Sequence, residues 1–418
     1  MLFRSVNARA LARDALERWR NATEFADQIV AEIFRQSALG AADRAFALEL
    51  FYGVLRNLTL LDFWIRELRS APVDPAARDI LRLGLYQTLL IETAAHAAVY
   101  ETVELAPPPK RTLINAILRR ALREKPALTD LAEVQPPAIR FSVPEFLFAK
   151  WSAQFGDEPA LELCRWNNQP PPLYARINQL RINAEEFLHR YPGSALLPGS
   201  SNFVRLSDPA AALRDGACYV QDPSTALACE LLRPAAGEMV LDACAAPGGK
   251  AAYLAEMMRN ADTLLVADQN EKRLERLREN FVRLGLRNAR TFCCDWTNRR
   301  SIGSAALDEK SFEKILVDVP CTNTGVMRRR IDVRWRLQAA DFARMPHQQL
   351  AILQAVAPLL KPGGSLVYST CSLEPEENED VVRTFLHRQP GFRLTDTKQS
   401  LPFRDAFDGA YAAKLSRS

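Results

Sequence analysis

The sequence predicts a multidomain protein with an all-α N-terminal domain, a small α/β domain and a C-terminal α/β domain built on a mostly parallel sheet. The chain has 418 residues, which is more than one ordinary hydrophobic core and suggests two or three domains. Its first part carries apolar side chains at helical spacing, whereas strand-like and helical patterns alternate from Val240 onward. The domains expected are residues 1–135, 136–236 and 237–418.

Composition and charge are typical of a globular protein. Hydrophobic residues make up 48% of the chain, and no window approaches ~18 consecutive apolar residues, so no membrane partner is expected. Charges throughout the first helix-like stretch argue against a secretory signal and favour a cytoplasmic location. The net charge of +4 is compatible with a nucleic-acid partner without indicating one. Eight cysteines without a Cys-x-x-Cys pair, and only four histidines, predict neither a disulfide framework nor a metal site.

Three stretches of the N-terminal domain have the apolar spacing of amphipathic helices. Apolar residues recur three and four positions apart in residues 25–34, 46–55 and 80–90, and strand-type alternation is absent. This pattern predicts an all-α bundle. The pattern breaks at residues 129–137, where Asp130 and two prolines predict a linker to the next domain.

Arginines are frequent around the helix predicted over residues 112–124. They are Arg111, Arg119, Arg120 and Arg123. A solvated helix face is one interpretation of such charges. An RNA-backbone contact surface is the other, because the planar guanidinium fork suits phosphate.

The section from Arg140 to about Ala236 mixes short helices with strand-like runs. Residues 146–155 and 158–166 have helical patterns, and residues 172–181 have a strand pattern after three prolines. Aromatic and basic side chains interleave here, which suits a single-stranded RNA surface. Core aromatics beside surface charges would give the same pattern. We predict a small α/β domain that links the two larger ones and recognises RNA.

From residue 239 onward, the alternation of strands and helices predicts a mostly parallel sheet with helices on both faces. The clearest helix is introduced by Asn270 as its N-cap and stopped at Gly285. Two late strands complete a seven-stranded sheet. The strand-like stretches are residues 239–244, 263–268, 289–294, 314–319, 365–371, 392–395 and 410–415.

The stretch MVLDACAAPGGK, residues 239–250, is the one around which the C-terminal domain is organised. A strand ends on Asp242, a glycine turn follows, and a helical pattern opens at Lys250. Glycines let the backbone approach a ligand closely, and the first N–H groups of a helix are unpaired donors. Such a turn at the carboxyl end of a first strand holds nucleotide-like cofactors in doubly wound sheets.

The residues that the turn lacks narrow the choice of cofactor. A dinucleotide fingerprint is missing, and Cys244 and Ala251 stand where a phosphate loop needs a glycine and a hydroxyl residue. S-adenosylmethionine fits the remaining features. An acidic residue in the turn would bind its amino group, and Asp268 at the end of the next strand would bind its ribose hydroxyls. We therefore expect S-adenosylmethionine as the cofactor.

Two cysteines follow the fourth and fifth predicted strands of the sheet. Cys321 ends ILVDVPC, and Cys371 lies in LVYSTCS. Because ligands sit outside the carboxyl ends of parallel strands, both thiols would face the cofactor cleft. A lone cysteine at a strand end is usually a packing residue. Two of them, beside an aspartate and a proline turn, form a much rarer constellation.

These motifs, DVPC with TNTG after it, STCSLEPEENE and the DACAAPGGK turn, resemble the RNA cytosine-C5 methyltransferases of the Nop/Sun class. The N-terminal domain resembles the RNA-binding NusB antitermination domain through ADRAFALELFYGVLR and INAILRRALR. Together they are similar to the bacterial 16S ribosomal RNA cytosine-C5 methyltransferases of the RsmB (Fmu/Sun) type, over almost the whole chain. The resemblance implies a Rossmann-like, class I S-adenosylmethionine-dependent methyltransferase domain at the C-terminus.

The chemistry of this family explains its cysteines. Carbon 5 of cytosine is too weak a nucleophile to take the methyl group until a thiolate adds to carbon 6, and cysteine ionises readily near neutral pH. The resemblance implies that Cys371 is the nucleophile and that Cys321 assists product release. The corresponding DNA enzymes use a Pro-Cys cysteine as nucleophile, and physical reasoning alone leaves both assignments open.

The resemblance also implies the other site residues. Asp318 would contact the methionine moiety and the cytosine edge as a general acid, and Lys250 would lie in the active site. Without the resemblance, they would be interpreted as a turn cap and a solvated charge. Asp295 matches the adenine contact. The cofactor-binding residues implied are Cys244, Ala245, Ala246, Pro247, Gly248, Gly249, Lys250, Asp268, Asp295 and Asp318.

Arginines after the Pro-Cys loop are further candidates for RNA contact. They follow Cys321 closely in the sequence, where they could hold the phosphates of a flipped-out nucleotide, although a structural surface gives the same cluster. Thr322 stands where this class more commonly has serine. The RNA-binding residues expected are Arg328, Arg329, Arg334, Arg119 and Arg120.

The expected partner is 16S ribosomal RNA, naked or at an early assembly stage, and the expected enzyme is a monomer without metal. Two other functions stay open from the sequence. One is the same chemistry on transfer RNA or large-subunit ribosomal RNA, and the other is a catalytically inactive RNA-binding factor of ribosome assembly. Intact Cys321, Cys371, Asp318 and Lys250 argue against the inactive factor.

Overall fold

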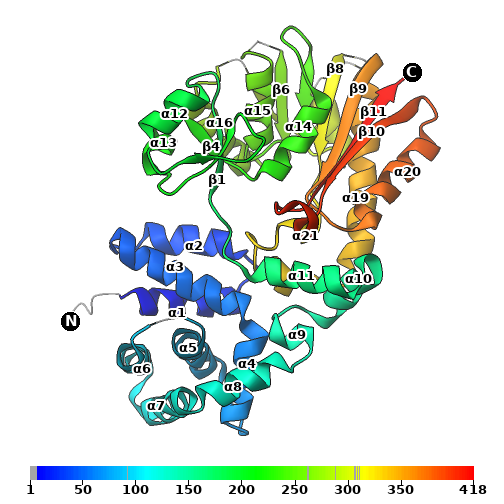
Figure 1. Cartoon of the computed structure of the whole chain (residues 1–418). Coiled ribbons are helices and arrows are strands. Elements are labelled where there is room, and N and C mark those ends of the chain that lie inside the picture. Colours follow the sequence, from blue (N-terminus) through cyan, green and yellow to red (C-terminus); the bar gives the residue numbers. More distant parts are fainter. Residues whose placement is uncertain are drawn as a thin grey trace. The chain divides into compact units, whose positions relative to one another are not determined.

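The computed structural model describes residues 7–91, 93–260, 263–287, 289–305, 307, 309 and 311–418 (Figure 1). The chain divides into two compact units. Unit 1 comprises residues 1–170 and 327–336, and unit 2 comprises residues 171–326 and 337–418. Residues 1–6, which enter the prediction that no secretory signal is present, lie outside the described residues. The predicted fold class is confirmed by an N-terminal set of helices, a small antiparallel sheet and a seven-stranded sheet.

Unit 1 consists of helices and their connections wherever it is described. The helices predicted over residues 25–34, 46–55 and 80–90 are confirmed as α2, α3 and the pair α5 and η1. The helices of unit 1 are α1 (Ala8–Asn21), α2 (Ala26–Arg35), α3 (Ala41–Arg56), α4 (Leu58–Leu68), α5 (Pro75–Leu85), η1 (Tyr86–Leu90), α6 (Ala95–Glu104), α7 (Pro108–Arg123), α8 (Lys125–Glu133), α9 (Pro137–Arg140), α10 (Glu145–Phe155), α11 (Asp157–Asn168) and α18 (Val333–Arg336).

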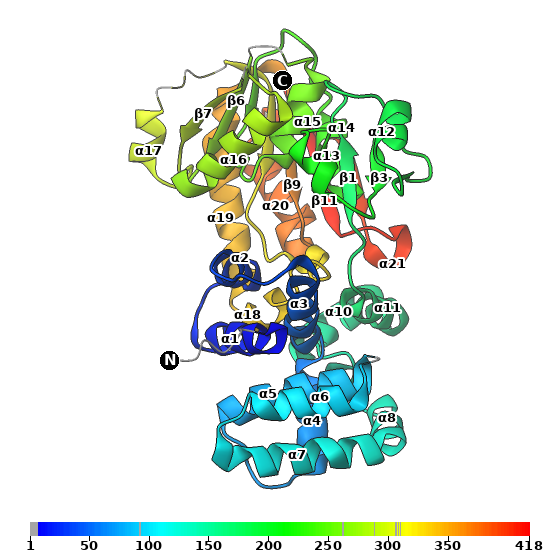
Figure 2. The same ribbon diagram turned by 90° about the vertical axis from the view of Figure 1, so that its left-hand side faces the viewer.

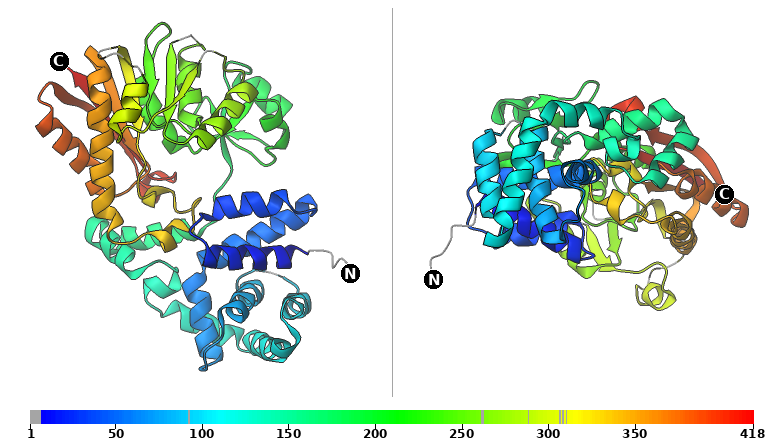
Figure 3. Two further views of the ribbon diagram at one scale, coloured as in Figure 1. Left: turned by 180° about the vertical axis from the view of Figure 1, so that it is seen from behind. Right: turned by 90° about the horizontal axis from the view of Figure 1, so that it is seen from below.

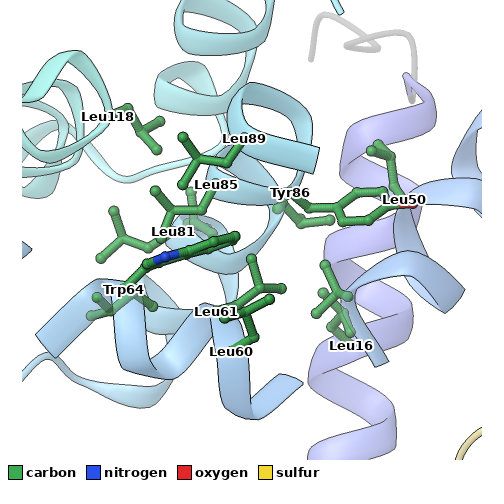
Figure 4. Packing of buried hydrophobic residues seen from close by; sticks show 14 of the residues in the cluster. Leu16, Leu50, Leu60, Leu61, Trp64, Leu81, Leu85, Tyr86, Leu89 and Leu118 are labelled. Carbon is green, nitrogen blue, oxygen red and sulfur yellow. The ribbon is translucent and has the colours of Figure 1, made fainter. Parts of the chain in front are cut away.

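A large apolar core stabilises the helices of unit 1 (Figure 4). Leu16 of α1, Leu50 of α3 and Leu81 of α5 are buried in it, and each such side chain contributes roughly 1.5–3 kcal/mol when it leaves water. Trp64 of α4 is buried as well, and its indole Nε1 donates to the carbonyl oxygen of Leu128 at 2.9 Å. The helical periodicity of the sequence therefore reflects one shared core.

A short segment from the second half of the sequence, residues 327–336, completes unit 1. Ile331 is fully buried in the core of this unit. Asp332 accepts a hydrogen bond from the backbone N–H of Ala26 at 2.7 Å, and the indole of Trp335 donates to the carbonyl oxygen of Leu55 at 2.9 Å. Figure 2 shows α18 beside α1, α2 and α3. The chain therefore leaves unit 2 after the Pro-Cys loop, contributes to unit 1 and then returns.

The predicted linker at residues 129–137 is wrong for most of its length, because α8 continues to Glu133. Leu128 and Ala132 are buried on one face of this helix, while Asp130 is exposed on another. The Thr129 hydroxyl donates to the carbonyl oxygen of Lys125 at 2.9 Å, within the helix. An exposed polar face therefore gave the appearance of a break. Residues 136–170, expected in the middle domain, lie in unit 1 as α9, α10 and α11.

A small antiparallel sheet opens unit 2, with the strand order β2-β3-β1-β4. Its first strand follows the three prolines, as predicted. Ala175, Ile177 and Val204 of this sheet pack with Phe187 of α12 in a separate core. The elements are β1 (Tyr174–Ile177), β2 (Ala195–Leu196), β3 (Phe203–Arg205) and β4 (Cys218–Val220), with helices α12 (Ala184–Arg190) and α13 (Ala210–Arg214).

The large sheet of unit 2 has the strand order β10-β11-β9-β8-β5-β6-β7. The neighbouring strands β7, β6, β5, β8 and β9 pair in parallel, whereas β11 pairs antiparallel with β9 and β10. All seven predicted strands are confirmed. They are β5 (Val240–Asp242), β6 (Leu264–Asp268), β7 (Arg290–Cys293), β8 (Phe312–Asp318), β9 (Leu360–Thr370), β10 (Phe392–Ser400) and β11 (Ala410–Arg417).

Alternate side chains of this sheet enter two different cores, as the period of two in a strand requires. Leu316 and Val367 pack with α14, α15 and α16, whereas Ile315 and Leu366 pack with α19 and α20. Figure 2 shows the first group of helices over one face, and the left view of Figure 3 shows the second over the other. The helices of this domain are α14 (Ala226–Leu232), α15 (Gly249–Met257), α16 (Glu271–Leu284), α17 (Arg299–Ser304), α19 (Asp341–Val356), α20 (Glu379–Arg388) and α21 (Pro402–Asp405).

Candidate active site

The turn after β5 lies at the point where the strand order of the sheet reverses, between β6 and β8. In sheets of this kind, ligands bind outside the carboxyl ends of the strands at that point. Gly248 has a φ of 106°, and a Cβ there would lie 3.0 Å from Leu277 Cγ. A Cβ on Gly249 would lie 2.8 Å from the ring of Tyr219. The turn holds the predicted residues Cys244, Ala245, Ala246, Pro247, Gly248 and Gly249.

Asp268 lies at the end of β6, as predicted, and its carboxylate supports the turn. One oxygen accepts a hydrogen bond from the backbone N–H of Ala246 at 3.1 Å, and the other accepts one from Asn270 at 3.0 Å. A carboxylate has about four lone-pair positions, so it can accept further hydrogen bonds from ligand hydroxyls. This side chain therefore both shapes the turn and offers acceptor positions beside it.

Asp295 follows β7, one strand further from the turn. Its carboxylate accepts hydrogen bonds from the backbone N–H and the hydroxyl of Thr297, at 2.9 and 2.7 Å. The backbone N–H of Asp295 donates to the Ser301 hydroxyl at 2.9 Å. These bonds fix the loop after β7 at the same edge of the sheet.

Asp242, at the end of β5, is the acidic residue of the stretch 239–250, although the sequence reasoning did not include it by number among the site residues. Its side chain is fully buried, and neither carboxyl oxygen has a hydrogen-bond partner of acceptable geometry among the described residues. Burial raises the pKa of Asp242 to about 8, the charge of Asp318 adds to the shift, and Lys250 opposes it. A buried carboxyl without a partner is costly unless a ligand supplies one. Its place at the end of the first parallel strand was the signal in the sequence.

Lys250 and Asp318 form an ion pair beside the turn. The Lys250 ammonium lies 2.7 Å from one oxygen of Asp318, and the Ser369 hydroxyl donates to the other at 2.7 Å. Burial opposes the charged form of Lys250, but the charge and hydrogen bond of Asp318 outweigh it and raise the pKa of Lys250. The structure therefore joins the start of α15 to the ends of β8 and β9.

The thiols of Cys321 and Cys371 are in direct contact, with their sulfur atoms 3.1 Å apart. The Cys371 thiol also donates to the side-chain oxygen of Asn323 at 3.2 Å. Cys321 is buried, whereas Cys371 is partly exposed. The hydrogen bond to Cys371 raises the pKa of Cys321 well above its usual value, and burial and the charge of Glu377 add to the shift. The two thiols predicted from strand ends therefore form one site.

Two glycines hold the loops around these thiols together. The backbone N–H of Gly325 donates to the carbonyl oxygen of Cys371 at 3.0 Å, and that of Gly409 donates to Gly325 at 2.7 Å. A Cβ on Gly325 would lie 2.7 Å from the Cα of Gly409. The Pro-Cys loop therefore packs closely against both the loop after β9 and the segment before β11. Sequence reasoning missed this contact, because it joins segments far apart in the chain.

The arginines expected to contact RNA lie in unit 1, whereas both thiols lie in unit 2. Arg119 and Arg120 are exposed on α7, and Arg120 forms an ion pair with Glu124 at 2.9 Å. Arg329 is half-buried. Arg328 is buried, with its guanidinium carbon 4.0 Å from the ring centroid of Trp166.

The prediction of a phosphate contact at Arg334 is corrected by the structure, since this side chain is only 1% exposed. Its guanidinium donates to the carbonyl oxygens of Ser142 and Asn167, at 3.0 and 3.1 Å, and to the side-chain oxygen of Asn168 at 2.8 Å. Burial lowers the pKa of Arg334 to about 9. All of these acceptors belong to unit 1, so Arg334 is a structural residue of that unit.

Within the described ranges, no helix is long and apolar enough to cross a membrane. The same residues contain no group of three or more histidine, cysteine or acidic side chains that could hold a metal ion.

Comparison with known families matches three stretches of the chain. Residues 229–416 match the family described as 16S rRNA methyltransferase RsmB/F, residues 6–123 match the NusB family, and residues 143–192 match the ferredoxin-like domain of the RsmF/B methyltransferases. A curated relative, ribosomal RNA small subunit methyltransferase B of Salmonella heidelberg (strain SL476), is 34% identical, with 98% of each chain covered. The chain belongs to the RsmB family. The Salmonella newport (strain SL254) relative of this name has the same identity and coverage.

Solved structures agree with the RsmB family fold. The crystal structure of PH0851 aligns with a TM-score of 0.78 at 24% identity and covers 98% of both chains, which shows a shared fold. A methyltransferase homolog protein from Pyrococcus horikoshii aligns with a TM-score of 0.58 at 28% identity, over 68% of this chain and 98% of its own.

S-adenosylmethionine is the cofactor of this RsmB-family methyltransferase, and the residues at the turn fit it. Asp242 offers a buried carboxyl without an internal partner, which suits a cationic ligand. Asp268 keeps acceptor positions for ribose hydroxyls, and the glycines let the backbone approach closely. Lys250 pairs with Asp318 and Arg273 lies 3.7 Å from Asp268, which leaves Asp242 as the carboxyl available to a cationic group of the ligand.

Proposed function

We propose that this protein transfers a methyl group to carbon 5 of a cytosine in 16S ribosomal RNA. The observation that carries the proposal is the contact of the Cys321 and Cys371 thiols, 3.1 Å apart, in the unit that holds the Lys250–Asp318 pair. Nitrogen and oxygen acceptors already have a nucleophilic lone pair, whereas an aromatic ring carbon needs covalent activation. Two thiols at the cofactor edge therefore favour a carbon acceptor. The relatives named as small-subunit methyltransferases support the choice of RNA.

In the proposed reaction, the Cys371 thiolate forms a bond to carbon 6 of cytosine. The electron pair of the 5,6 double bond then takes the methyl group at carbon 5. Loss of the proton from carbon 5 returns an electron pair to the ring, and the bond between sulfur and carbon 6 breaks to release the thiolate. S-adenosylmethionine supplies the methyl group on a sulfonium when it is bound.

The environment of each residue supports its proposed role. Cys371 is the more accessible thiol, and its neighbour Lys250 is a cation whose own pKa is raised partly by the thiol's charge. Asp318 is held at both oxygens, by Lys250 and Ser369, which fixes the carboxyl group that we propose contacts the cytosine edge. Cys321 would then assist release of the product.

For the RNA itself, we propose contacts to the exposed Arg119 and Arg120 on α7 and to the half-buried Arg329. We further propose that the enzyme acts as a monomer in the cytoplasm, on protein-free RNA or an early assembly intermediate.

The decisive experiment incubates the purified protein with labelled S-adenosylmethionine and protein-free 16S RNA and maps 5-methylcytosine. We expect one labelled cytosine with the wild-type protein and none with Cys371→Ala. Cys293→Ala is the matched control, because Cys293 is an exposed thiol at the end of β7, outside the pair. If Cys371→Ala methylates at the wild-type rate, Cys371 is not the nucleophile.

A second measurement separates the roles of the thiols. Cys321→Ala should accumulate a covalent protein–RNA adduct, seen as a slower band on a denaturing gel, because the adduct forms but is released slowly. If the covalent adduct accumulates in Cys371→Ala instead, Cys321 is the nucleophile and Cys371 assists product release.

The same assay distinguishes the other functions. Preferred labelling of transfer RNA or 23S RNA over 16S RNA would change the substrate and leave the chemistry in place. No labelling of any RNA by a protein that binds its cofactor would favour an inactive assembly factor.

A further inference from the structure

Glu377 is a buried carboxylate between the two loops that carry the thiols. It ends η5 (Pro375–Glu377), six residues after Cys371, and its side chain is fully buried. In the sequence it belongs to the acidic run EPEENE, which is usually a solvated surface. A charged group at such a position needs partners for all its lone pairs, and the structure supplies them.

The donors to Glu377 come from the residues that directly follow each cysteine. Thr322 donates through its backbone N–H to Oε2 at 2.9 Å and through its hydroxyl to Oε1. Ser372 donates its hydroxyl to Oε1 at 2.7 Å. One carboxylate therefore bridges the residue after Cys321 and the residue after Cys371. A change in its position would move both loops.

A helix side chain completes the arrangement. The amide of Gln349, on α19, donates to Oε2 of Glu377 at 2.7 Å and to the carbonyl oxygen of Pro320 at 3.0 Å. The hydroxyl of Tyr368, in β9, donates to the backbone carbonyl oxygen of Glu377 at 2.6 Å. The backbone is thus held on both sides of Cys321, through Pro320 and Thr322, by groups anchored in the sheet and its covering helix.

We propose that Glu377 is a positioning residue that sets the distance between the two thiols by bridging the residues that follow them. The expected effect of Glu377 on methyl transfer rests on the proposed function. Its expected effect on the distance between the thiols rests on the geometry alone. Glu377 accepts four buried hydrogen bonds. Three of them come from Thr322 and Ser372, which directly follow the two cysteines, so loss of the carboxylate frees both loops together. A shift of about 1 Å at a reacting group can lower a rate on the order of 10²-fold.

The charge of Glu377 has a second effect on the same pair. It stands on the Cys321 side, where it helps to raise the pKa of that thiol. Lys250 stands on the Cys371 side. Among the described residues, the titratable groups that act on the thiols are each other, Glu377, Tyr368 and Lys250, and Lys250 is paired with Asp318. Removing the carboxylate should make Cys321 easier to ionise.

The test uses the isosteric variant Glu377→Gln, which keeps the volume and removes the charge. Glu379→Gln is the matched control, since Glu379 lies two residues later on the exposed side of α20. Thr322→Val removes one hydroxyl donor, and Thr322→Ser restores it. Thermal unfolding and cofactor binding show first whether each variant is folded.

The first measurements need no RNA. One is the rate at which hydrogen peroxide links Cys321 to Cys371, which reports their distance, and the other is the pH at which iodoacetamide alkylates each thiol. We expect Glu377→Gln to slow the linkage about tenfold and to move the alkylation of Cys321 to lower pH. Glu379→Gln and Thr322→Ser should match the wild type, and Thr322→Val should slow the linkage. A folded Glu377→Gln protein with wild-type linkage and alkylation would overturn the proposal.

Methyl transfer to 16S RNA is measured on the same proteins. We expect Glu377→Gln to lower kcat on the order of 10²-fold with a KM for RNA within about threefold of wild type. A raised KM with unchanged kcat would overturn the positioning role. If the wild-type protein methylates no RNA, the proposed function fails, while the linkage and alkylation data still decide the role of Glu377.

Discussion

Asp242→Asn should make the cofactor-free protein more stable and its cofactor binding weaker. The carboxyl is fully buried at the end of β5, and burial raises its pKa from 3.8 to about 8 although Lys250 and the backbone of Cys244 oppose the shift. Each pH unit between the folded and unfolded values corresponds to about 1.4 kcal/mol, so the whole interval represents roughly 6 kcal/mol of unfolding free energy. Such a side chain is retained for its ligand, at the expense of stability.

The sign of the pH dependence follows from the direction of the shift. The folded state holds the Asp242 proton more tightly than the unfolded state, so the stability from this group is fully present below pH 3.8. It falls as the pH rises and is lost once the pH passes about 8. Asparagine carries no titrating proton. The variant should therefore gain about 1.4 kcal/mol per pH unit relative to wild type between about pH 5 and 8.

Urea unfolding of the cofactor-free protein at several pH values between 5 and 8 measures this difference. Asp396→Asn, the same change on the exposed strand β10, is the control and should follow the wild-type curve. Calorimetry of cofactor binding at pH 7 gives an independent check, since binding should release most of a proton from wild type and none from Asp242→Asn. Parallel stability curves for wild type and Asp242→Asn would refute the reasoning, because they would mean that the carboxyl is ionised and solvated in the folded state.

Three further outcomes are expected from the geometry. Gly325→Ala should lower the rate of methyl transfer on the order of 10²-fold, because the added Cβ forces the neighbouring loops apart. Gly303→Ala is the control and should leave the rate unchanged, because a Cβ there would meet nothing within 4 Å. Single-turnover kinetics measures both rates. Arg334→Ala should destabilise unit 1 by about 3 kcal/mol or more, because it leaves buried carbonyl oxygens without a donor. The exposed control Arg344→Ala should cost about 1 kcal/mol or less. Urea unfolding measures both changes. Hydrogen peroxide should take two electrons and two protons from the contacting thiols and give a disulfide, which mass spectrometry detects. A reductant should reverse this disulfide, and Cys371→Ser should prevent it.

The elements with strong local signals were predictable from the sequence. The parallel strands are short apolar runs between turn signals, and α16 begins after Asn270, whose side chain caps it at 3.2 Å, and ends at Gly285 in the left-handed conformation. Both depend on residues close in the sequence. The predicted linker failed at α8 because a helix with one exposed polar face resembles a break when the packing partner of its other face is distant.

Side-chain roles that depend on distant residues were less predictable. The two thiols could be placed together because the carboxyl ends of parallel strands share one edge. The position of Arg334 could not, since a buried arginine held by carbonyl oxygens and a solvated arginine that waits for phosphate look the same in a sequence. Glu377 was hidden for the same reason within an acidic run. Burial of a charge depends on donors from other elements, such as Gln349 on α19.

The structure adds a physical reason for the assignment of the nucleophile that the sequence left open. Two identical groups in contact compete for one proton, and their surroundings decide which sulfur keeps it. The charge of the carboxylate Glu377 acts on Cys321, whereas the ammonium of Lys250 is paired with Asp318 at 2.7 Å. Negative charge beside a thiol disfavours its ionisation, and positive charge favours it. Cys321 is therefore held in its protonated form, and Cys371 is the sulfur that a substrate can reach.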